Sequence, residues 1–343
     1  MNERNLLISF LQTFGIILVV IGHSDYGNPD FLFRQWLYTF HMPLFIFISG
    51  FLLQYTEEKK GVVLSDLFST HWGSFVAKKA KRLLLPYAFI SSAVFLPKVY
   101  FSYFAIRPIS GSWNEWAHML VYPWDNIIAY YWFFPTLFGV MIIVASMVWL
   151  AAKLKWNVPI FITLGILLAL HLFNPAQGIL LFNLEGIVFY LLYFVLGIYY
   201  CQYRALIDKR LYLESCGALC ITGLLSVILL CLHKYCDMGN CFEVVMAING
   251  ILMSISLGHF YIKRNWRFFH HLYGASAAIY IFSWFPQVAS QQVLTKIIPL
   301  PWSVTMPLAT ISGIYIPLLL YKLIGYVKTR FRYGKYIALL LGQ

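Results

Sequence analysis

The sequence predicts an all-α fold, a polytopic membrane helix bundle of about ten transmembrane helices with both termini in the cytoplasm. The composition is the first reason, because 61% of the 343 residues are hydrophobic, 11% are charged and the mean hydropathy is +0.73. The second reason is a series of apolar runs of about 20 residues, the length that crosses a bilayer. The third reason is the alternation of basic residues between the loops. A soluble globular domain of this length does not need so much apolar surface, so that class is excluded.

The apolar runs define the expected spans, which follow one another without a soluble module between them. In chain order they are 6–24, 36–54, 84–104, 127–151, 158–173, 180–200, 212–232, 243–261, 274–291 and 304–325. No internal repeat is visible, so we expect one integral-membrane domain over residues 1–343. Within the longest cytoplasmic connection, residues 65–76 begin with a capping residue and place large apolar side chains roughly on one side. This pattern predicts a helix that lies in the membrane interface.

Lysine and arginine are concentrated in alternate loops. The loops rich in them carry Lys59, Lys60, Lys78, Lys79, Lys81 and Arg82, then Lys153 and Lys155, then Arg204, Lys209 and Arg210, then Lys263, Arg264 and Arg267, and finally Lys322, Lys328, Arg330, Arg332 and Lys335. Cytoplasmic loops are enriched in these residues, so the alternation places both termini in the cytoplasm. The net charge of +12 reports this topology and an attraction to anionic membrane lipid, and it does not require nucleic acid as a partner.

The cysteines give little support for a disulfide framework or a metal site. Four of them lie in or beside expected helices, where cysteine packs as a small apolar residue: Cys201, Cys216, Cys220 and Cys231. Cys236 and Cys241 fall in an expected outer loop, where a disulfide and two free thiols are equal alternatives. No histidine or carboxylate stands at ligand spacing from the cysteines, so we expect no metal.

Two histidines stand in the first two apolar runs. His23 closes the first run, and His41 lies near the start of the second. A helix turns about 100° and rises about 1.5 Å per residue, so Gln12 and His23 share nearly the same face, roughly 16 Å apart. An imidazole in a membrane span is costly unless it faces protein or water, and it titrates near neutral pH. For His23 the alternatives at this point are proton transfer and helix packing; for His41 they are a catalytic or binding role and packing.

Several segments in addition to these histidines form a recognisable series. They are Leu11–His23 with its Val-Val-x-Gly-His ending, the sequence Phe-His-Met-Pro-Leu-Phe-x-Phe-x-Ser-Gly-Phe at 40–51, Lys79-x-x-Arg82-Leu-Leu-x-Pro, Tyr131–Leu137, Phe194–Ile198 and Ile279–Ile281. In order and spacing, over most of the chain, this series resembles the acyltransferase-3 membrane proteins. That family O-acylates sugars of bacterial surface polysaccharides and other acceptors. Ten spans with cytoplasmic ends also match the family.

The resemblance implies roles for three of these residues. His23 matches the catalytic histidine that ends an Arg-x10-His motif in the family. Lys79 and Arg82 match an Arg-x-x-Arg motif that is linked to the acyl-coenzyme A donor. Lysine at the first of these two positions keeps the charge but loses the bidentate guanidinium fork.

Three other positions depart from the family pattern. Gln12 stands where the first motif has arginine, Ser9 where it has an acidic residue, and Ser283 where a histidine often follows the Ile-Tyr segment. The amide of Gln12 still offers two hydrogen-bond donors and an acceptor. We therefore expect Gln12 to hydrogen-bond the donor or a neighbouring helix, and the chain to remain a working transferase. The rival interpretation is that loss of the arginine leaves a binding or transport role.

Other side chains are weaker candidates for the site. Lys78 and Lys81, beside the two basic motif residues, are expected to hold coenzyme A phosphates, although positive-inside topology alone also explains them. Tyr131 and Trp132 are candidates for stacking on a sugar or an acyl carrier, or for an aromatic belt at the membrane interface. Glu185 is an acid inside an expected outer half-span, where carboxylates are often functional, or it lies at the interface.

These features predict an acyl-CoA-dependent O-acyltransferase of the bacterial inner membrane. It would move an acyl group, expected to be acetyl, from cytoplasmic acyl-coenzyme A to a hydroxyl of a cell-surface glycan or its lipid-linked precursor. Such a transfer needs a base and hydrogen-bond donors for the developing oxyanion. The alternatives are a non-enzymatic polysaccharide exporter, which has the same hydropathy, and the same enzyme class with succinyl or another acyl group.

Overall fold

The computed structural model describes residues 3–24, 32–102, 108–235 and 239–342, and it contains no β-strand in these ranges. The expected all-α fold is therefore confirmed. Cys236 lies outside the described residues, so the two alternatives for the pair it would form with Cys241 remain predictions.

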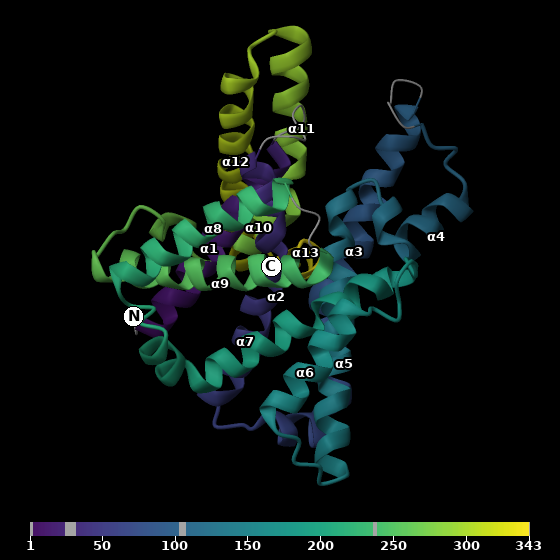
Figure 1. The fold of residues 1–343 in the computed structure, drawn as a ribbon. Helices are drawn as coiled ribbons and strands as arrows, with labels where there is room; N and C mark the ends of the chain where they lie inside the picture. The colour runs from purple at the N-terminus through teal and green to yellow at the C-terminus, as the bar shows by residue number, and fades with distance from the viewer. Residues whose placement is uncertain (1–2, 25–31, 103–107, 236–238, 343) are drawn as a thin grey trace. The chain divides into compact units, whose positions relative to one another are not determined.

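The described chain is a succession of helices joined by short connections (Figure 1). In chain order the α-helices are α1 (Glu3–Ser24), α2 (Leu32–Lys59), α3 (Leu64–Tyr100), α4 (Trp113–Val121), α5 (Phe133–Lys153), α6 (Ile160–Leu172), α7 (Leu184–Arg210), α8 (Cys216–Tyr235), α9 (Gly239–Lys263), α10 (Ser276–Phe282), α11 (Trp284–Gln292), α12 (Trp302–Arg330) and α13 (Gly334–Leu340). They form two compact units. The first unit is Met1–Thr56 with Tyr193–Lys322, and the second is Glu57–Leu192 with Leu323–Gln343.

Eight helical segments of the described chain are long and apolar enough to cross a membrane. They are Leu6–Ser24, Leu32–Lys59, Thr70–Tyr100, Tyr130–Lys153, Leu181–Arg210, Cys216–His233, Gly239–Lys263 and Trp302–Arg330. The two remaining expected spans, 158–173 and 274–291, are helical, but their helices are shorter than these eight segments. α6, in the first of these ranges, has 13 residues. At 1.5 Å per residue it is about 20 Å long, less than the hydrocarbon thickness of about 30 Å.

The second short span is divided into α10 and α11 at Ser283. Pro286 lies in the first turn of α11 and has no backbone N–H, so it cannot bond the carbonyl of Phe282 four residues earlier. The lost hydrogen bond falls at the point where α10 ends. A single apolar run in the sequence therefore gives two short helices.

α3 joins two elements that the sequence predicts as separate. Its 37 residues include both the expected interfacial segment 65–76 and the third span, so the helix begins well before the expected start at residue 84. α3 is kinked at His71, inside the expected interfacial segment, because the backbone angles of this residue, φ −127° and ψ 23°, are not helical. The basic stretch from Lys78 to Arg82 consequently lies inside a continuous helix and not in a loop.

Two glycines allow α2 and α7 to approach closely in the first unit. A Cβ atom added to Gly50 would collide with the backbone oxygen of Phe194, and one added to Gly197 would collide with that of Phe47. Small residues at such crossings let helix backbones approach each other in membrane proteins. The crossing fixes the middle of α2, and therefore the half of that helix that carries His41.

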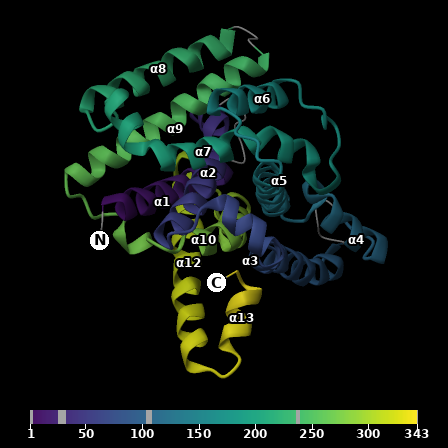
Figure 2. The same ribbon diagram turned by 90° about the horizontal axis from the view of Figure 1, so that it is seen from below.

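α8 and α9 run side by side in the same unit (Figures 1 and 2). The amide of Asn249 on α9 donates to the carbonyl oxygen of Thr222 at 3.0 Å and to Ser226 Oγ at 2.8 Å, both on α8. Polar contacts of this kind join helices where lipid tails are as apolar as the side chains. They hold α9 as the support on which α1 packs.

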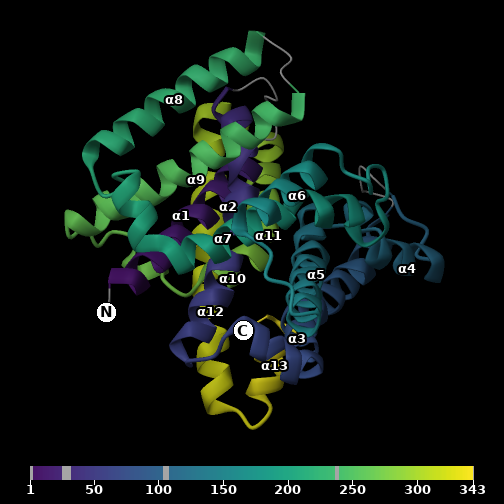
Figure 3. The ribbon, with the colours of Figure 1, turned by 60° about the horizontal axis from the view of Figure 1, so that its bottom comes forward.

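The second unit is built on α3, which packs against α5 and is also contacted by α13 (Figure 3). The connection between α4 and α5 is tied to α7 through Asn183, whose side-chain amide donates to Thr136 Oγ1 at 2.7 Å. The indole of Trp124 in turn donates to Asn183 Oδ1 at 2.9 Å. These buried bonds give the chain around α4 a fixed geometry.

Candidate functional site

His23 lies in the last turn of α1, and a tyrosine connects it to His41. The ring of Tyr38 on α2 makes an edge contact with His23, with the ring centroids 6.2 Å apart, and another with His41 at 4.9 Å. The Tyr38 hydroxyl donates to the carbonyl oxygen of Gly22 at 3.3 Å. The first unit therefore brings the two predicted histidines into one cluster, which we call the histidine cluster: His23, Tyr38 and His41.

The hydrogen bonding of His41 fixes which ring nitrogen carries a proton. Its Nδ1 lies 2.7 Å from the carbonyl oxygen of Leu37, one turn earlier in α2. A carbonyl only accepts, so Nδ1 must donate and must carry the hydrogen. In the neutral ring Nε2 is then the basic nitrogen. His41 is buried, so its ring is held in one orientation within the cluster.

The end of α1 that carries His23 is capped by two glutamines of α11. Gln287 Nε2 donates to the carbonyl oxygen of Val20 at 2.7 Å and to Ser24 Oγ at 2.8 Å. Gln291, one turn later, donates to the carbonyl oxygen of Ser24 at 2.9 Å. The Ser24 carbonyl is one of the last carbonyls of α1, which have no partner within the helix, so the Gln291 bond satisfies it. Gln287 instead adds to a bond already present, because Ser24 Oγ donates to the Val20 carbonyl oxygen at 2.8 Å. Together the bonds of the two glutamines fix the position of the last turn of α1.

These glutamines are not among the candidate residues that the sequence predicts for the site. The signal that was available in the sequence is the group of polar residues Gln287, Ser290 and Gln291 at the end of the expected span 274–291. Amides are uncommon inside membrane spans unless they bind a partner. The sequence alone does not say that the partner is the end of α1, more than 260 positions earlier.

Gln12 lies half-buried in the middle of α1, eleven residues before His23. The helix is continuous between them, so the two side chains share a face as expected. Its neighbour Thr13 is fully buried, and its hydroxyl has no hydrogen-bond partner among the described residues. The role expected for Gln12 remains a prediction.

The basic residues expected to bind the donor lie on α3 in the second unit. Lys78, Lys81 and Arg82 are exposed, and the ammonium of Lys79 lies 5.3 Å from the centre of the Phe75 ring. Four cations within five residues of one helix create a strong positive potential, which attracts phosphate groups. The arrangement is therefore suitable for binding the phosphates of a nucleotide-containing donor.

The aromatic candidates Tyr131 and Trp132 are buried inside the second unit. The indole of Trp132 is stacked on Trp124 on one side, at 4.9 Å between centroids, and on Tyr190 at 5.7 Å. Both faces of this indole are consequently in contact with protein. The burial favours a packing role, since a sugar could stack on Trp132 only after one of these rings had moved.

Glu185 serves the local structure at the start of α7. Its Oε2 accepts from the backbone N–H of Gly178 at 3.0 Å, and its carbonyl oxygen accepts from the side-chain amide of Asn174 at 2.9 Å. The side chain is half-buried. These bonds hold the connection between α6 and α7 against the first turn of α7.

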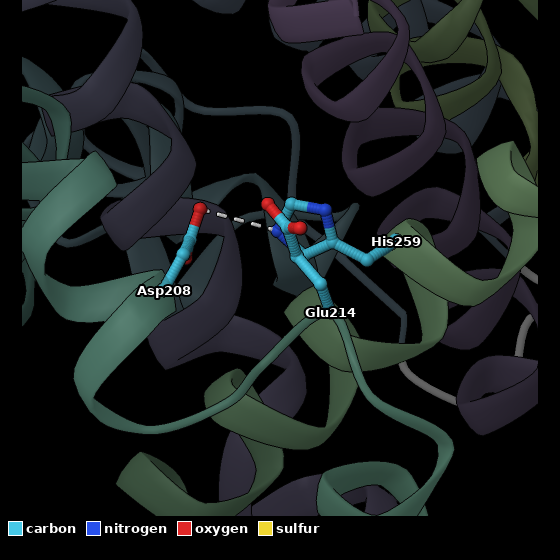
Figure 4. A group of neighbouring side chains, drawn as sticks. All are labelled: Asp208, Glu214 and His259. Carbon is cyan, nitrogen blue, oxygen red and sulfur yellow. Dashed lines mark ion pairs between the residues drawn. The ribbon is translucent and has the colours of Figure 1, made fainter.

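A second polar group, which the sequence did not reveal, lies where α7 and α9 end. Figure 4 shows the side chains of Asp208, Glu214 and His259 directed toward one another. Their oxygen and nitrogen atoms lie within 4.8 Å of each other, and His259 Nε2 is 3.3 Å from Asp208 Oδ2. These are residue types that can hold a divalent cation.

The surroundings of Asp208 favour an ion-pair network over a cation site. Arg204 Nε donates to Asp208 Oδ2 at 3.1 Å, and the Tyr200 hydroxyl donates to Asp208 Oδ1 at 2.8 Å. A guanidinium bound to the same oxygen would repel a metal ion. The charge of Arg204 already balances that of Asp208 without any ion. We call these five residues the aspartate network: Tyr200, Arg204, Asp208, Glu214 and His259.

Comparison with known proteins identifies the family of the chain. The family profile of acyltransferase-3, described as an acyltransferase domain, matches residues 5–322. No curated protein and no solved structure matches the chain. The matched range contains the histidine cluster, the glutamines of α11 and the basic stretch of α3. With its membrane-spanning helices, the chain belongs to the acyltransferase-3 family of membrane acyltransferases.

Proposed function

We propose that the protein transfers an acyl group from acyl-coenzyme A to a hydroxyl of a cell-surface glycan, or of its lipid-linked precursor, in the bacterial inner membrane. The observation that carries this proposal is the histidine cluster at the end of α1, inside a chain of the acyltransferase-3 family. Two imidazoles near one membrane surface, one of them with a fixed tautomer, supply the base that transfer to a hydroxyl requires.

In the proposed reaction His23 takes the proton of the acceptor hydroxyl as its oxygen attacks the thioester carbonyl carbon. The tetrahedral intermediate then collapses, the carbon–sulfur bond breaks, and the coenzyme A sulfur leaves with the proton returned by His23. The Gln287 and Gln291 bonds contribute by holding the backbone of α1 in place. His41 Nε2, with its proton on Nδ1, is proposed to accept a hydrogen bond from a neighbouring hydroxyl of the acceptor.

The donor is proposed to bind through Lys78, Lys79, Lys81 and Arg82, because coenzyme A carries several phosphate charges. Acetyl is the proposed group, and succinyl is the alternative. Replacing both Lys79 and Arg82 with alanine should raise the KM for acetyl-coenzyme A by about tenfold or more, since each hydrogen bond to a charged group contributes about 1.5–3 kcal/mol. The control is a double alanine substitution of Lys328 and Arg330, which are exposed on α12. An equal change of KM in both variants would mean that the basic residues of α3 set the membrane topology and do not bind the donor.

The function is tested with purified protein in lipid nanodiscs and with cells. Release of free thiol from acetyl-coenzyme A in the presence of acceptor glycan reports the transfer. Mass spectrometry of the surface glycan from deletion and complemented strains should show a difference of one acyl unit, which identifies the group. Unchanged glycan mass, together with acyl-coenzyme A that is not consumed, would favour the exporter alternative.

A further inference from the structure

The second unit contains a cavity that the reaction described above does not use. Its volume is about 400 Å³, and it is partly open to the surroundings. Four polar side chains line it: Asn114, Glu115, His118 and Asp125. The apolar lining includes Phe95 from α3 and Met119 from α4. The size lies within the range of small-molecule sites, about 300–1,000 Å³.

One carboxylate of this cavity is oriented by its own loop. Glu115 Oε2 accepts from Ser110 Oγ at 2.7 Å and from the backbone N–H of Gly111 at 2.9 Å. The bond from Ser110, together with those from the backbone, lowers the pKa of Glu115. Ser112 Oγ accepts from the Glu115 backbone N–H at 3.2 Å and begins α4. The carboxylate is thus held ionised at a fixed position before any ligand arrives.

The other carboxylate forms a pair with an imidazole. His118 Nε2 lies 2.9 Å from Asp125 Oδ2, and the His118 ring stacks on Tyr122 with 4.4 Å between centroids. A carboxylate accepts, so Nε2 carries the hydrogen, and the wall of the cavity then presents Nδ1 in addition to the carboxylates. The two carboxylates outweigh the single imidazole, so the cavity is negative whether or not His118 is protonated.

This charge determines which ligands are compatible with the cavity. Phosphate groups and sugar acids would be repelled, which excludes the coenzyme A donor. Carboxylate oxygens and the Asn114 amide accept and donate hydrogen bonds in the pattern that sugar hydroxyls require. The buried Met119 and the aromatic ring of Phe95 provide an apolar surface for the C–H face of a sugar ring. Trp113, beside Asn114 on α4, is 82% exposed and adds an aromatic surface next to the cavity.

We propose that this cavity binds a neutral sugar ring of the acceptor glycan. The assignment of the sugar to the acceptor rests on the proposed function. In the proposed topology α4 lies between the third and fourth spans, on the outer side of the membrane, where the glycan is presented. The cavity would select the acceptor through the hydroxyls of one ring, and the transfer itself would take place at another ring or hydroxyl.

The test uses the full chain in nanodiscs. The ligands are methyl β-glucoside and methyl β-galactoside at about 10 mM, a concentration well above the Kd of about 1 mM that we expect for a single sugar ring. Saturation-transfer NMR should show binding of at least one neutral glycoside and none of methyl β-glucuronide. Asp125→Asn keeps the shape but removes the charge, and Asn114→Leu fills the polar wall. Each should weaken binding by about tenfold. Asp66→Asn, at the exposed start of α3, is the matched control and should leave binding unchanged.

Three results would overturn the proposal: no neutral glycoside bound by the wild-type protein, binding of the glucuronide alone, or equal binding by the wild type and both cavity variants. Size-exclusion profiles identify a variant that has failed to fold, and in that case the other variant decides. Thiol release from acetyl-coenzyme A is measured in parallel. Consumption without glycoside binding rejects only the cavity, whereas glycoside binding without consumption rejects the proposed function and the assignment to the acceptor.

Discussion

The first unit contains two groups of polar residues that include histidine, the histidine cluster and the aspartate network. They differ in the charge of the residues around the imidazole. In the histidine cluster His41 contacts the ring of Tyr38 and the carbonyl oxygen of Leu37, both of them neutral. In the aspartate network His259 lies beside a carboxylate that also binds Arg204. Opposite charges are paired in the aspartate network, whereas in the histidine cluster the Arg34 guanidinium lies over the Tyr38 ring, 5.1 Å from its centre. Paired buried charges serve structure, whereas the imidazoles beside Tyr38 are the ones that we propose take a proton.

The largest expected effect is on catalysis by the histidine cluster. His23→Ala should lower acyl transfer by about 10²–10⁴-fold, because a positioned general base contributes that much. The measurement is thiol release from acetyl-coenzyme A by reconstituted protein. His233→Ala, which removes an exposed histidine of α8, should be near wild type. Full activity of His23→Ala would remove this residue from the mechanism and leave His41 as the base.

Substitutions in the aspartate network should change the stability of the protein and not its activity. Asp208→Asn leaves Arg204 without its counter-charge in a mostly buried position, so we expect a loss of about 3–5 kcal/mol in the free energy of unfolding. Glu214→Gln, at an exposed position, should cost less than about 1 kcal/mol. Thermal unfolding in detergent measures both.

The activity of the Asp208→Asn protein that remains folded should stay close to that of the wild type. A chelator such as EDTA should leave the melting temperature of the wild type unchanged. If the chelator lowered it instead, Asp208, Glu214 and His259 would be a cation site after all.

The glutamines of α11 give an intermediate effect on the histidine cluster. Gln287→Ala removes two hydrogen bonds to the last turn of α1, each contributing about 0.5–1.5 kcal/mol. We expect kcat to fall by about tenfold while the KM for acetyl-coenzyme A stays the same, since the donor does not contact this residue in our proposal. Gln292→Ala, on the exposed side of the same helix, is the control. A change in the donor KM with unchanged kcat would contradict a positioning role.

The sequence predicts one of these two groups better than the other for a physical reason. His23 and His41 stand out because each is a polar residue in an apolar run, and hydropathy along the chain is enough to find them. The aspartate network depends on α7 and α9 ending close together, which no local pattern encodes. For the same reason the sequence does not predict the hydrogen bonds of Gln287 to the end of α1, or the burial of Trp132 between two rings.

The helices show a similar limit. The apolar runs correctly predict an all-α membrane bundle, since hydrophobic length follows directly from bilayer thickness. They do not predict that α3 continues from the basic stretch into the membrane, because helix continuity depends on backbone hydrogen bonds and not on hydropathy. Likewise the break between α10 and α11, before Pro286, lies inside an apolar run that hydropathy predicts to be one span.

The last expected effect concerns Gln12, which lies on the same helix as His23 and where the chain departs from the family. Gln12→Ala should lower activity by about tenfold or more, since losing a buried hydrogen bond costs about 1–3 kcal/mol. Gln202→Ala, at an exposed position on α7, should have no effect. Arginine in a helix centre costs about 2.5–3.5 kcal/mol on insertion scales, so Gln12→Arg should express less well than the wild type. If wild-type protein transferred no acyl group but Gln12→Arg did, loss of the arginine would have disabled the enzyme, and His23 would be a remnant of a catalytic site in a protein that binds or transports its glycan.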